Sequence, residues 1–347
     1  MHMADALLSP AVGGTMWVAT AGTIAHCAKK VQRDLDDRKI PLMGVLGAFI
    51  FAAQMINFTI PATGSSGHLG GGMILAILLG PYAAFLTIAS VLTVQALFFA
   101  DGGLLALGCN IFNLGIFPCF ISYPLIYKPI AGRRPSPTKI AIGATLGAVV
   151  ALQLGALGVV VETVTSGISS LPLKPFLSVM LPIHLAIGLV EGLVTTAVVS
   201  FVWKARPEIL ELTAAAKPLG ALNLRNVLAG LMVAAVVTGG ALSWFASSSP
   251  DGLEWSMFKV TGSEELDAPE EGVHHTLATL QEKTAFLPDY GFKQSSPTES
   301  IENSEPETSS WPMIDSGTST SGLVGGILTL MMAAALGLLF KRRAHTV

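Results

Sequence analysis

The amino-acid sequence predicts an all-α, polytopic membrane protein with about nine transmembrane helices and its N-terminus outside. The first observation is composition: the 347 residues are 51% hydrophobic and only 12% charged, and the mean hydropathy is positive. Such values are typical of proteins that expose apolar surface to lipid. The second is a series of apolar segments that approach the roughly 20 residues a helix needs to cross a bilayer. The third is the placement of lysine and arginine between alternate segments.

Nine apolar segments are the candidate crossings. They lie at about Ala11–Ala28, Pro41–Ile60, Leu69–Leu79, Tyr82–Ala100, Leu104–Ile126, Ile140–Val161, Phe176–Trp203, Val227–Ala246 and Leu323–Phe340. The third is too short to span comfortably alone, and its Gly70-Gly71-Gly72 start indicates a broken helix packed within the protein. We therefore expect a seven-helix bundle in residues 1–206 and a two-helix module in residues 225–347.

Basic residues give the orientation. Lysine and arginine cluster at Lys29–Lys39, Lys128–Lys139, Lys204–Arg225 and Lys341–Arg343, and each cluster is cytoplasmic under the positive-inside rule. All four clusters require the same alternation of crossings. The N-terminus and the loop Pro61–His68 are then both expected on the outer face.

The second part of the chain differs in composition from the first. A polar stretch from about Ser247 to Ser321 separates its two apolar segments, and the beginning of this stretch is acidic. Its later part, Ser295–Ser310, has few large apolar residues, so we expect it to be disordered.

Several classes of protein are disfavoured. The net charge of -3 gives no indication of a nucleic-acid partner. The three cysteines, Cys27, Cys109 and Cys119, lie apart in apolar stretches, which argues against a disulfide framework or a thiolate metal site. Zinc-protease, phosphate-loop and nucleophile-elbow motifs are missing from the sequence, so an enzyme is not expected and any ATP must be hydrolysed by a separate subunit.

The N-terminus offers metal ligands. A free amine on Met1, the amide nitrogen of His2 and the His2 imidazole can chelate one ion, and the imidazole of His68 can fill the fourth corner. Four nitrogens in a plane suit Ni(II) or Cu(II). The sequence shows no basic leader or continuous apolar core before Gly14, so we expect the encoded N-terminus to be the mature one. Any N-terminal histidine offers the same atoms, but here the topology brings His68 to the same membrane face.

Three motifs then resemble a known family. They are Met1-His2-Met3-Ala4-Asp5-Ala6-Leu7-Leu8-Ser9-Pro10, Ala53-Gln54-Met55-Ile56-Asn57-Phe58 and Ser66-Gly67-His68-Leu69-Gly70. Over about Met1–Arg206 the chain resembles the substrate-binding M subunit of energy-coupling-factor transporters, an ATP-binding-cassette class, for cobalt and nickel. The remainder resembles the small N subunit fused in frame, on the motif Pro250-Asp251-Gly252-Leu253-Glu254-Trp255.

This resemblance implies a function. Met1, His2 and His68 would bind Ni(II) or Co(II) outside the cytoplasmic membrane, for cobalamin biosynthesis or nickel enzymes. A transmembrane coupling (T) subunit and ATPase subunits would drive uptake. The segment Thr59–Gly64 departs from the usual family pattern, which leaves the path of this loop open. The alternatives are an autonomous secondary transporter or channel for a small solute, and a membrane metal sensor that does not transport.

Other polar residues have two interpretations each. Gln54 and Asn57 lie one turn apart and either support the ligand imidazole or link helices. For Asn110 and Asn113, nothing local in the sequence aims them at the site. For His184 and Glu191, which share a helical face inside the bilayer, we expect structural hydrogen bonding. For the loop pair His274-His275, we expect exposure to solvent. The small residues Gly44, Ala48 and Ala52 form a stripe that either docks the coupling subunit or packs within the chain.

Overall fold

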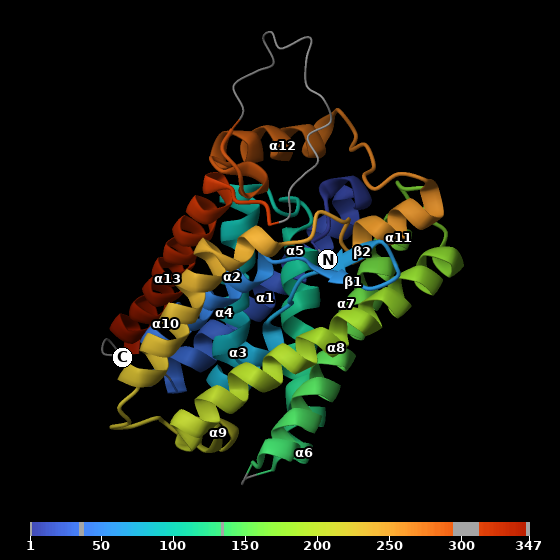
Figure 1. Cartoon of the computed structure of the whole chain (residues 1–347). Helices are drawn as coiled ribbons and strands as arrows, with labels where there is room; N and C mark the ends of the chain where they lie inside the picture. The colour runs from blue at the N-terminus through green and yellow to red at the C-terminus, as the bar shows by residue number, and fades with distance from the viewer. Residues whose placement is uncertain (1, 35–37, 133–134, 294–311, 345–347) are drawn as a thin grey trace.

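The computed structural model describes residues 2–34, 38–132, 135–293 and 312–344. In its first part the helices are η1 (Asp5–Leu7), α1 (Pro10–Asp34), α2 (Lys39–Gln54), α3 (Gly72–Leu79), α4 (Pro81–Phe99), α5 (Leu107–Ile111), η2 (Phe112–Tyr127), α6 (Lys128–Ala131), α7 (Pro137–Ser166), α8 (Leu173–Ala205) and α9 (Pro207–Ala214). In its second part they are α10 (Arg225–Gly240), η3 (Leu242–Phe245), α11 (Gly252–Thr261), α12 (Gly272–Thr284), η4 (Pro288–Tyr290) and α13 (Ser316–Ala344). The predicted helical class is confirmed (Figure 1).

Five helical stretches within the described residues are long and apolar enough to cross a membrane, fewer than the nine crossings predicted. They are Pro81–Phe99, Leu107–Ala131, Pro137–Ser166, Leu173–Ala205 and Ser316–Leu339. The remaining predicted crossings correspond to α1, to α2 and α10, which are apolar but only 16 residues long, and to α3. At 1.5 Å per residue, the eight residues of α3 extend for about 12 Å, which is too short to span a bilayer alone.

The short α3 lies inside the bundle, as its glycine-rich start suggested. Every residue of α3 is buried, and Gly71 at its N-cap has a φ of 75°, a left-handed conformation that glycine adopts without strain. A Cβ at Gly72 would lie only 2.4 Å from the ring of Pro118 in η2. Glycine therefore allows the chain leading into α3 to pass against η2.

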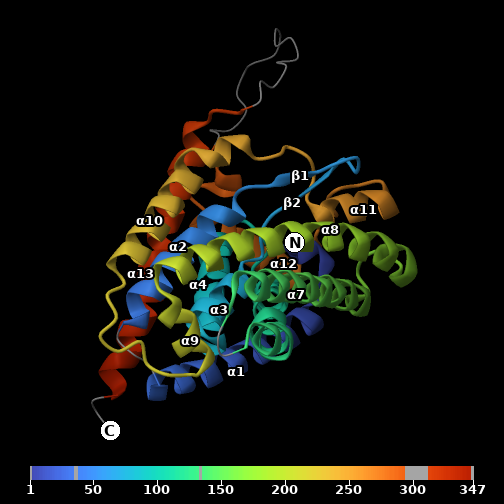
Figure 2. The ribbon, with the colours of Figure 1, turned by 60° about the horizontal axis from the view of Figure 1, so that its bottom comes forward.

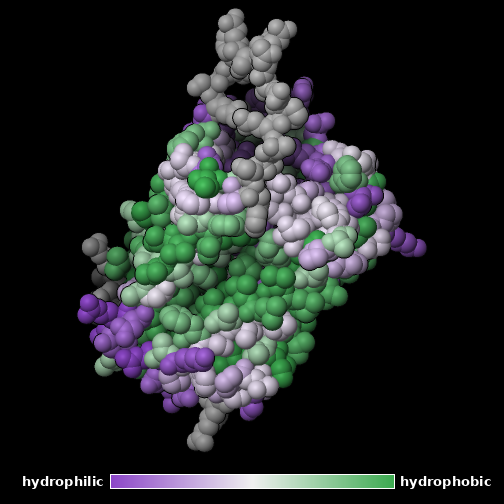
Figure 3. Space-filling model, viewed as in Figure 1, coloured by the Kyte–Doolittle hydropathy of each residue, from purple (hydrophilic) through white to green (hydrophobic). Residues whose placement is uncertain are grey.

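Leucines form an outward face along α8. Leu185, Leu189 and Leu193 recur every four residues and are 47%, 50% and 66% exposed. Figure 3 shows hydrophobic residues in a broad band across the middle of the molecule, with hydrophilic residues at both ends. Such a band fits contact with lipid hydrocarbon.

The stripe of small residues on α2 packs within the chain. A Cβ at Gly44 would lie 3.2 Å from the carbonyl oxygen of Leu330 in α13, and one at Gly326 would lie 3.9 Å from Ala48. Ala52 is also buried. In Figures 1 and 2, α13 and α10 run beside α2. Of the two interpretations of this stripe, the structure favours packing within the chain over docking of a coupling subunit, because α13 of the same chain covers it.

Two short strands depart from a purely helical fold. β1 (Phe58–Ile60) and β2 (Ser65–Gly67) pair antiparallel, with Thr59 opposite Ser66. The intervening turn contains Ala62 at a φ of 64° and Gly64 at 75°. The loop whose path the sequence left open is therefore a β-hairpin that leads directly into His68.

Part of the polar stretch between α10 and α13 is helical. It forms α11 and α12, which lie with the hairpin at one end of the molecule, while α6 and α9 lie at the other (Figure 1). The segment predicted to be disordered, Ser295–Ser310, lies outside the described residues.

Candidate functional site

The hairpin that carries His68 is fastened to the second part of the chain. Ser66 donates from its backbone nitrogen to the carbonyl oxygen of Pro250 at 2.8 Å and from its hydroxyl to that of Ser249 at 2.7 Å. The indole nitrogen of Trp255 donates to the carbonyl oxygen of Thr63 at 3.0 Å. Two of these bonds use backbone groups of the hairpin, Ser66 N–H and Thr63 C=O, so they hold in place the segment that ends at His68.

The motif residues 250–254 explain how α11 begins. The carboxylate of Asp251 accepts hydrogen bonds from the backbone of Leu253 at 2.7 Å and Glu254 at 3.0 Å, while Glu254 accepts one from the backbone of Asp251 at 2.8 Å. This reciprocal capping box satisfies amides that the first turn of a helix leaves free. The other oxygen of Asp251, Oδ2, lies 3.7 Å from Nε2 of His68. The motif thus begins a helix and places a carboxylate beside the histidine.

Glu191 holds the chain on the other side of His68. Its two carboxylate oxygens accept hydrogen bonds from the backbone of Gly70 at 2.9 Å and Gly71 at 3.0 Å. The side chain of Gln54 donates to the carbonyl oxygen of Gly70 at 2.9 Å. Glu191 has the structural role expected from the sequence, and that role anchors the segment that follows the histidine.

The N-terminal segment is clamped by residues far away in the sequence. Asn110 accepts from the backbone nitrogen of Met3 at 2.8 Å and donates to its carbonyl oxygen at 3.2 Å. Asp5 accepts from the backbone of Ala106 at 2.9 Å. His274 of α12 lies 2.8 Å from the carbonyl oxygen of Leu8 and is buried, so the expectation of a solvated His274 is wrong. Asn110, which the sequence gave no reason to aim at the site, is one of its main supports.

His2 contacts the carboxylate of Asp101, which also accepts a hydrogen bond from the second part of the chain. Nδ1 of His2 lies 2.7 Å from Oδ1 of Asp101, and the hydroxyl of Tyr290 donates to Oδ2 of Asp101. Gln95 donates to the Tyr290 hydroxyl at 3.1 Å, and the Tyr290 ring stacks on Phe99 with centroids 5.3 Å apart. Burial raises the pKa of Asp101, but the charge and hydrogen bond of His2 and the Tyr290 hydroxyl outweigh it and hold this pKa below its ordinary value. Asp101 is therefore an anionic support for His2.

The two histidines meet. Their rings stack with centroids 4.8 Å apart and an angle of 26° between the planes. Nε2 of His2 is buried without a hydrogen-bond partner among the described residues, and burial lowers the pKa of His68, which favours its neutral form. Neutral imidazole is the form that binds metals. Met1, the third predicted ligand residue, lies outside the described residues.

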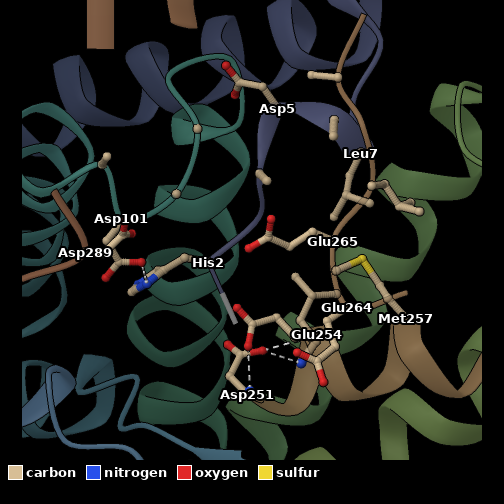
Figure 4. Close-up of a pocket in the computed structure, with 18 of the residues that line it drawn as sticks. His2, Asp5, Leu7, Asp101, Asp251, Glu254, Met257, Glu264, Glu265 and Asp289 are labelled. Carbon is tan, nitrogen blue, oxygen red and sulfur yellow. Dashed lines mark hydrogen bonds and ion pairs between the residues drawn. The ribbon is translucent and has the colours of Figure 1, made fainter. Parts of the chain in front are cut away.

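Both histidines line a cavity of about 530 Å³ that also contains carboxylates from both parts of the chain. These are Asp5, Asp101, Asp251, Glu254, Glu264, Glu265 and Asp289, and Figure 4 shows them around His2. Burial raises the pKa values of Asp5 and Glu254. Within the described residues, no cluster of three or more His, Cys, Asp or Glu side chains has metal-holding geometry. Among the described residues, the two imidazoles are therefore the nitrogen ligands that this cavity offers to an ion.

The predicted supporting residues lie in the same cavity. Gln54 and Asn57 both line it, and the carbonyl oxygen of Asn57 accepts a hydrogen bond from the backbone of Ser247 at 2.7 Å. Gln54 bonds the backbone after His68 and not its ring, so it acts through the loop. Asn113 instead donates to Glu162 at 2.8 Å, within the helical bundle.

Sequence reasoning did not identify Asp101 or Tyr290. Asp101 follows Ala100, which has a φ of 55°, in the glycine-containing turn after α4. An acidic residue in such a turn is the only feature of the sequence that could have indicated a role for Asp101 in the site. Tyr290 lies in the polar stretch, where no periodic pattern points to the site.

Several helices are long and apolar enough to span a bilayer, which defines the class as a multi-pass membrane protein. Its histidine pair lies in a cavity that α11 and α12 also line. The chain belongs to the family described as the cobalt uptake substrate-specific transmembrane region, which matches residues 2–209, and a PDGLE domain matches residues 225–342. It therefore has the fused M–N architecture that its sequence resembles.

Relatives with known names share this architecture or its first part. The putative fused nickel transport protein NikMN of Archaeoglobus fulgidus is 39% identical over 218 residues, which are 62% of this chain and 70% of that protein. The probable fused nickel transport protein LarMN of Lactiplantibacillus plantarum is 34% identical over 266 residues, 74% of this chain and 78% of that protein. The cobalt transport protein CbiM of Sorangium cellulosum is 30% identical over 223 residues, 61% and 95% of the two chains.

A solved structure also matches. The crystal structure of a transition metal transporter has a TM-score of 0.51 and 32% identity, and the match covers 61% of this chain and 96% of that one. The chain is thus a member of a cobalt and nickel transport family of membrane proteins.

Proposed function

We propose that this chain is the substrate-binding component of an energy-coupling-factor importer that captures Ni(II) or Co(II) outside the cell membrane. The observation that carries the proposal is the meeting of His2 and His68, whose rings stack at 4.8 Å although 65 residues separate them in the sequence. Nickel is the ion we favour, because a planar set of nitrogen ligands suits it and the fused relatives carry nickel in their names.

The ligands are the Met1 amine, the His2 amide and imidazole nitrogens, and the His68 imidazole. Only Nδ1 of a histidine lies near enough to its own amide nitrogen to close a chelate ring with it. Nδ1 of His2 faces Asp101 at 2.7 Å. Loading therefore exchanges Asp101 for the ion at Nδ1, or turns the imidazole so that Nε2 faces Asp101.

The orientation is supported by the basic end of the molecule. Lys30, Lys39, Lys128 and Lys217, which come from three of the clusters assigned to the cytoplasm, line one cavity of about 300 Å³. The helices α6 and α9 that bound this end lie opposite α11 and α12 in Figure 1. This arrangement supports a cytoplasmic basic end, an outer N-terminus and about nine crossings, with α3 completing one of them inside the bundle.

The residues 225–347 act as a loading module in this proposal. They contact each of the three segments that form the site: the hairpin through Pro250, the N-terminal segment through His274, and the turn after α4 through Tyr290. Their carboxylates are hard oxygen donors, less suited to this ion than nitrogen. We therefore assign them to capture and positioning and not to the final ligand set.

Import itself requires partners. We propose that a transmembrane T subunit and ATPase subunits bind this chain and supply the energy from ATP hydrolysis, and that the loaded chain reorients within the complex. The stripe on α2 is covered by α13, so the partner surface must lie elsewhere.

Replacing His68 with alanine tests the proposal. The substitution removes one of four nitrogen donors, so Ni(II) affinity in an equilibrium titration of the purified full chain should fall steeply. Leu69→Ala is the matched control, because Leu69 is the adjacent buried residue and offers no ligand. Equal affinities for the two variants would refute the assignment of His68.

A further inference from the structure

A second, much smaller cavity lies next to the histidine pair. Its volume is about 10 Å³, close to the smallest space that holds one water molecule. Its lining includes His68, His184 and Gly252. His68 lines this cavity and the large one as well, so a single side chain faces both spaces.

His184 presents an unused nitrogen at this cavity. Its Nδ1 lies 2.8 Å from the carbonyl oxygen of Met180, and because a carbonyl only accepts, Nδ1 carries the proton. Nε2 therefore holds a lone pair, yet it has no hydrogen-bond partner among the described residues and the residue is only 1% exposed. A buried polar group left without a partner destabilises the fold, so its retention calls for an explanation. A backbone carbonyl bound to one ring nitrogen, with the other free, is also the usual arrangement of a metal-binding histidine.

Gly252 keeps the space beside this nitrogen open. A Cβ at this position would lie 3.0 Å from Cε1 and 3.3 Å from Nε2 of His184. Gly252 is the first residue of α11 and follows Asp251, whose carboxylate lies 3.7 Å from Nε2 of His68. The glycine of the motif thus leaves room beside Nε2 of His184, in the cavity that His68 also lines.

We propose that His68 and His184 form a second, inner position for the same divalent ion. This inference rests on the proposed function. The ion keeps His68 and exchanges the nitrogens of Met1 and His2 for Nε2 of His184; the His2 amide regains a proton from solvent, and no oxidation or reduction takes place. Imidazole suits Ni(II) and Co(II) at both positions. The inner position has fewer nitrogen donors and binds more weakly, as a transport pathway requires for release.

The variant His184→Asn separates a ligand from a structural histidine. The asparagine amide occupies the place of Nδ1 and can donate to Met180, but it has no atom at the place of Nε2. In the full chain with wild-type His2, His184→Asn should leave the tight Ni(II) affinity within about threefold, a change of under 1 kcal/mol. Loss of tight binding in this variant would overturn the proposal, because His184 would then belong to the outer site or to the fold.

The decisive measurement uses His2→Ala, which removes the outer chelate. Ni(II) should still bind weakly to this full chain with two imidazoles, counted by X-ray absorption spectroscopy. His2→Ala/His184→Asn should bind at least about tenfold more weakly and lose one imidazole. Identical affinity and imidazole count in the two chains would overturn the inner site.

Thr195→Ala provides the matched control. Thr195 is on the same helix, is fully buried, and has a hydroxyl without a hydrogen-bond partner among the described residues. In the His2→Ala background it should change nothing. The proposed function is tested separately by the tight affinity of His68→Ala, so failure of the outer site and failure of the inner site give different results.

Discussion

Replacing Glu191 with glutamine tests whether the backbone after His68 must be held for metal binding. The carboxylate of Glu191 accepts hydrogen bonds from Gly70 at 2.9 Å and Gly71 at 3.0 Å. A glutamine retains one acceptor oxygen and puts an NH₂ group opposite the other backbone N–H. One bond is therefore lost, and two donors face each other in a buried place.

The size of the effect follows from that lost bond. A hydrogen bond contributes about 0.5–1.5 kcal/mol net, and one to a charged group about 1.5–3 kcal/mol. If the loss acts wholly on the position of His68, about 1–3 kcal/mol corresponds to an affinity about fivefold to 150-fold weaker. Competition titration of Ni(II) on the purified full chain measures this change directly.

Glu162→Gln is the control. Glu162 is a buried carboxylate that accepts hydrogen bonds from Asn113 at 2.8 Å and from the thiol of Cys109, and among the described residues it has no bond to the segment after His68. It should lose some stability and keep its Ni(II) affinity. The reasoning fails if Glu191→Gln binds Ni(II) as tightly as the wild-type chain, or if both variants lose affinity equally.

Three further predictions concern the supports and the N-terminus. Tyr290→Phe should lower the midpoint of thermal unfolding, because it removes a buried hydroxyl bonded to a carboxylate, worth about 1–3 kcal/mol. Tyr127→Phe is the control and should not lower it, because the Tyr127 hydroxyl has no hydrogen-bond partner among the described residues. Equal midpoints for the two variants would count against the bond between Tyr290 and Asp101 as a support of the site. Ni(II) affinity should rise with pH between about 7 and 8, because binding releases a proton from the α-amine of Met1 (ordinary pKa about 7.7–8.0) and another from the His2 amide. Burial lowers the pKa of His68 below 6.5, so His68 is already neutral there. Acetylation of the amine should weaken binding and reduce this pH dependence, and an unchanged titration would contradict the role of the amine. One alanine inserted between Met1 and His2 should sharply weaken binding, because ligand geometry must be held within about 0.5 Å; normal binding by a chain with an uncleaved N-terminal tag would leave at most a two-histidine site.

The sequence was informative where a periodic or charge pattern carries the information. The positive-inside rule placed the N-terminus and His68 on one face, and the structure brings His2 and His68 into contact. The glycine-rich start of α3 indicated a broken helix, and α3 is indeed short and buried. Crossing number was less predictable, because length and hydropathy alone do not say which helices are shielded by others.

The supports of the site were harder to predict. Asn110 binds the backbone of Met3, and a backbone partner leaves no complementary residue in the sequence. Tyr290 reaches Asp101 across 189 positions, through a stretch whose acidic composition indicated only solvent exposure. The hairpin at Phe58–Gly67 had a detectable signal, since a short Thr- and Ile-containing run precedes a proline–glycine turn.

The covalent link between the two parts of the chain has a kinetic consequence. Residues 215–224 alone connect α9 to α10, and α10 and α13 remain packed beside α2. In the proposed loading role, segments around Pro250 and Tyr290 that separate from the site would therefore stay close to it. A short tether gives an effective concentration in the millimolar range. In the proposed loading role, closure over a captured ion would then be a first-order event, with one module for every site and a rate independent of the density of the protein in the membrane.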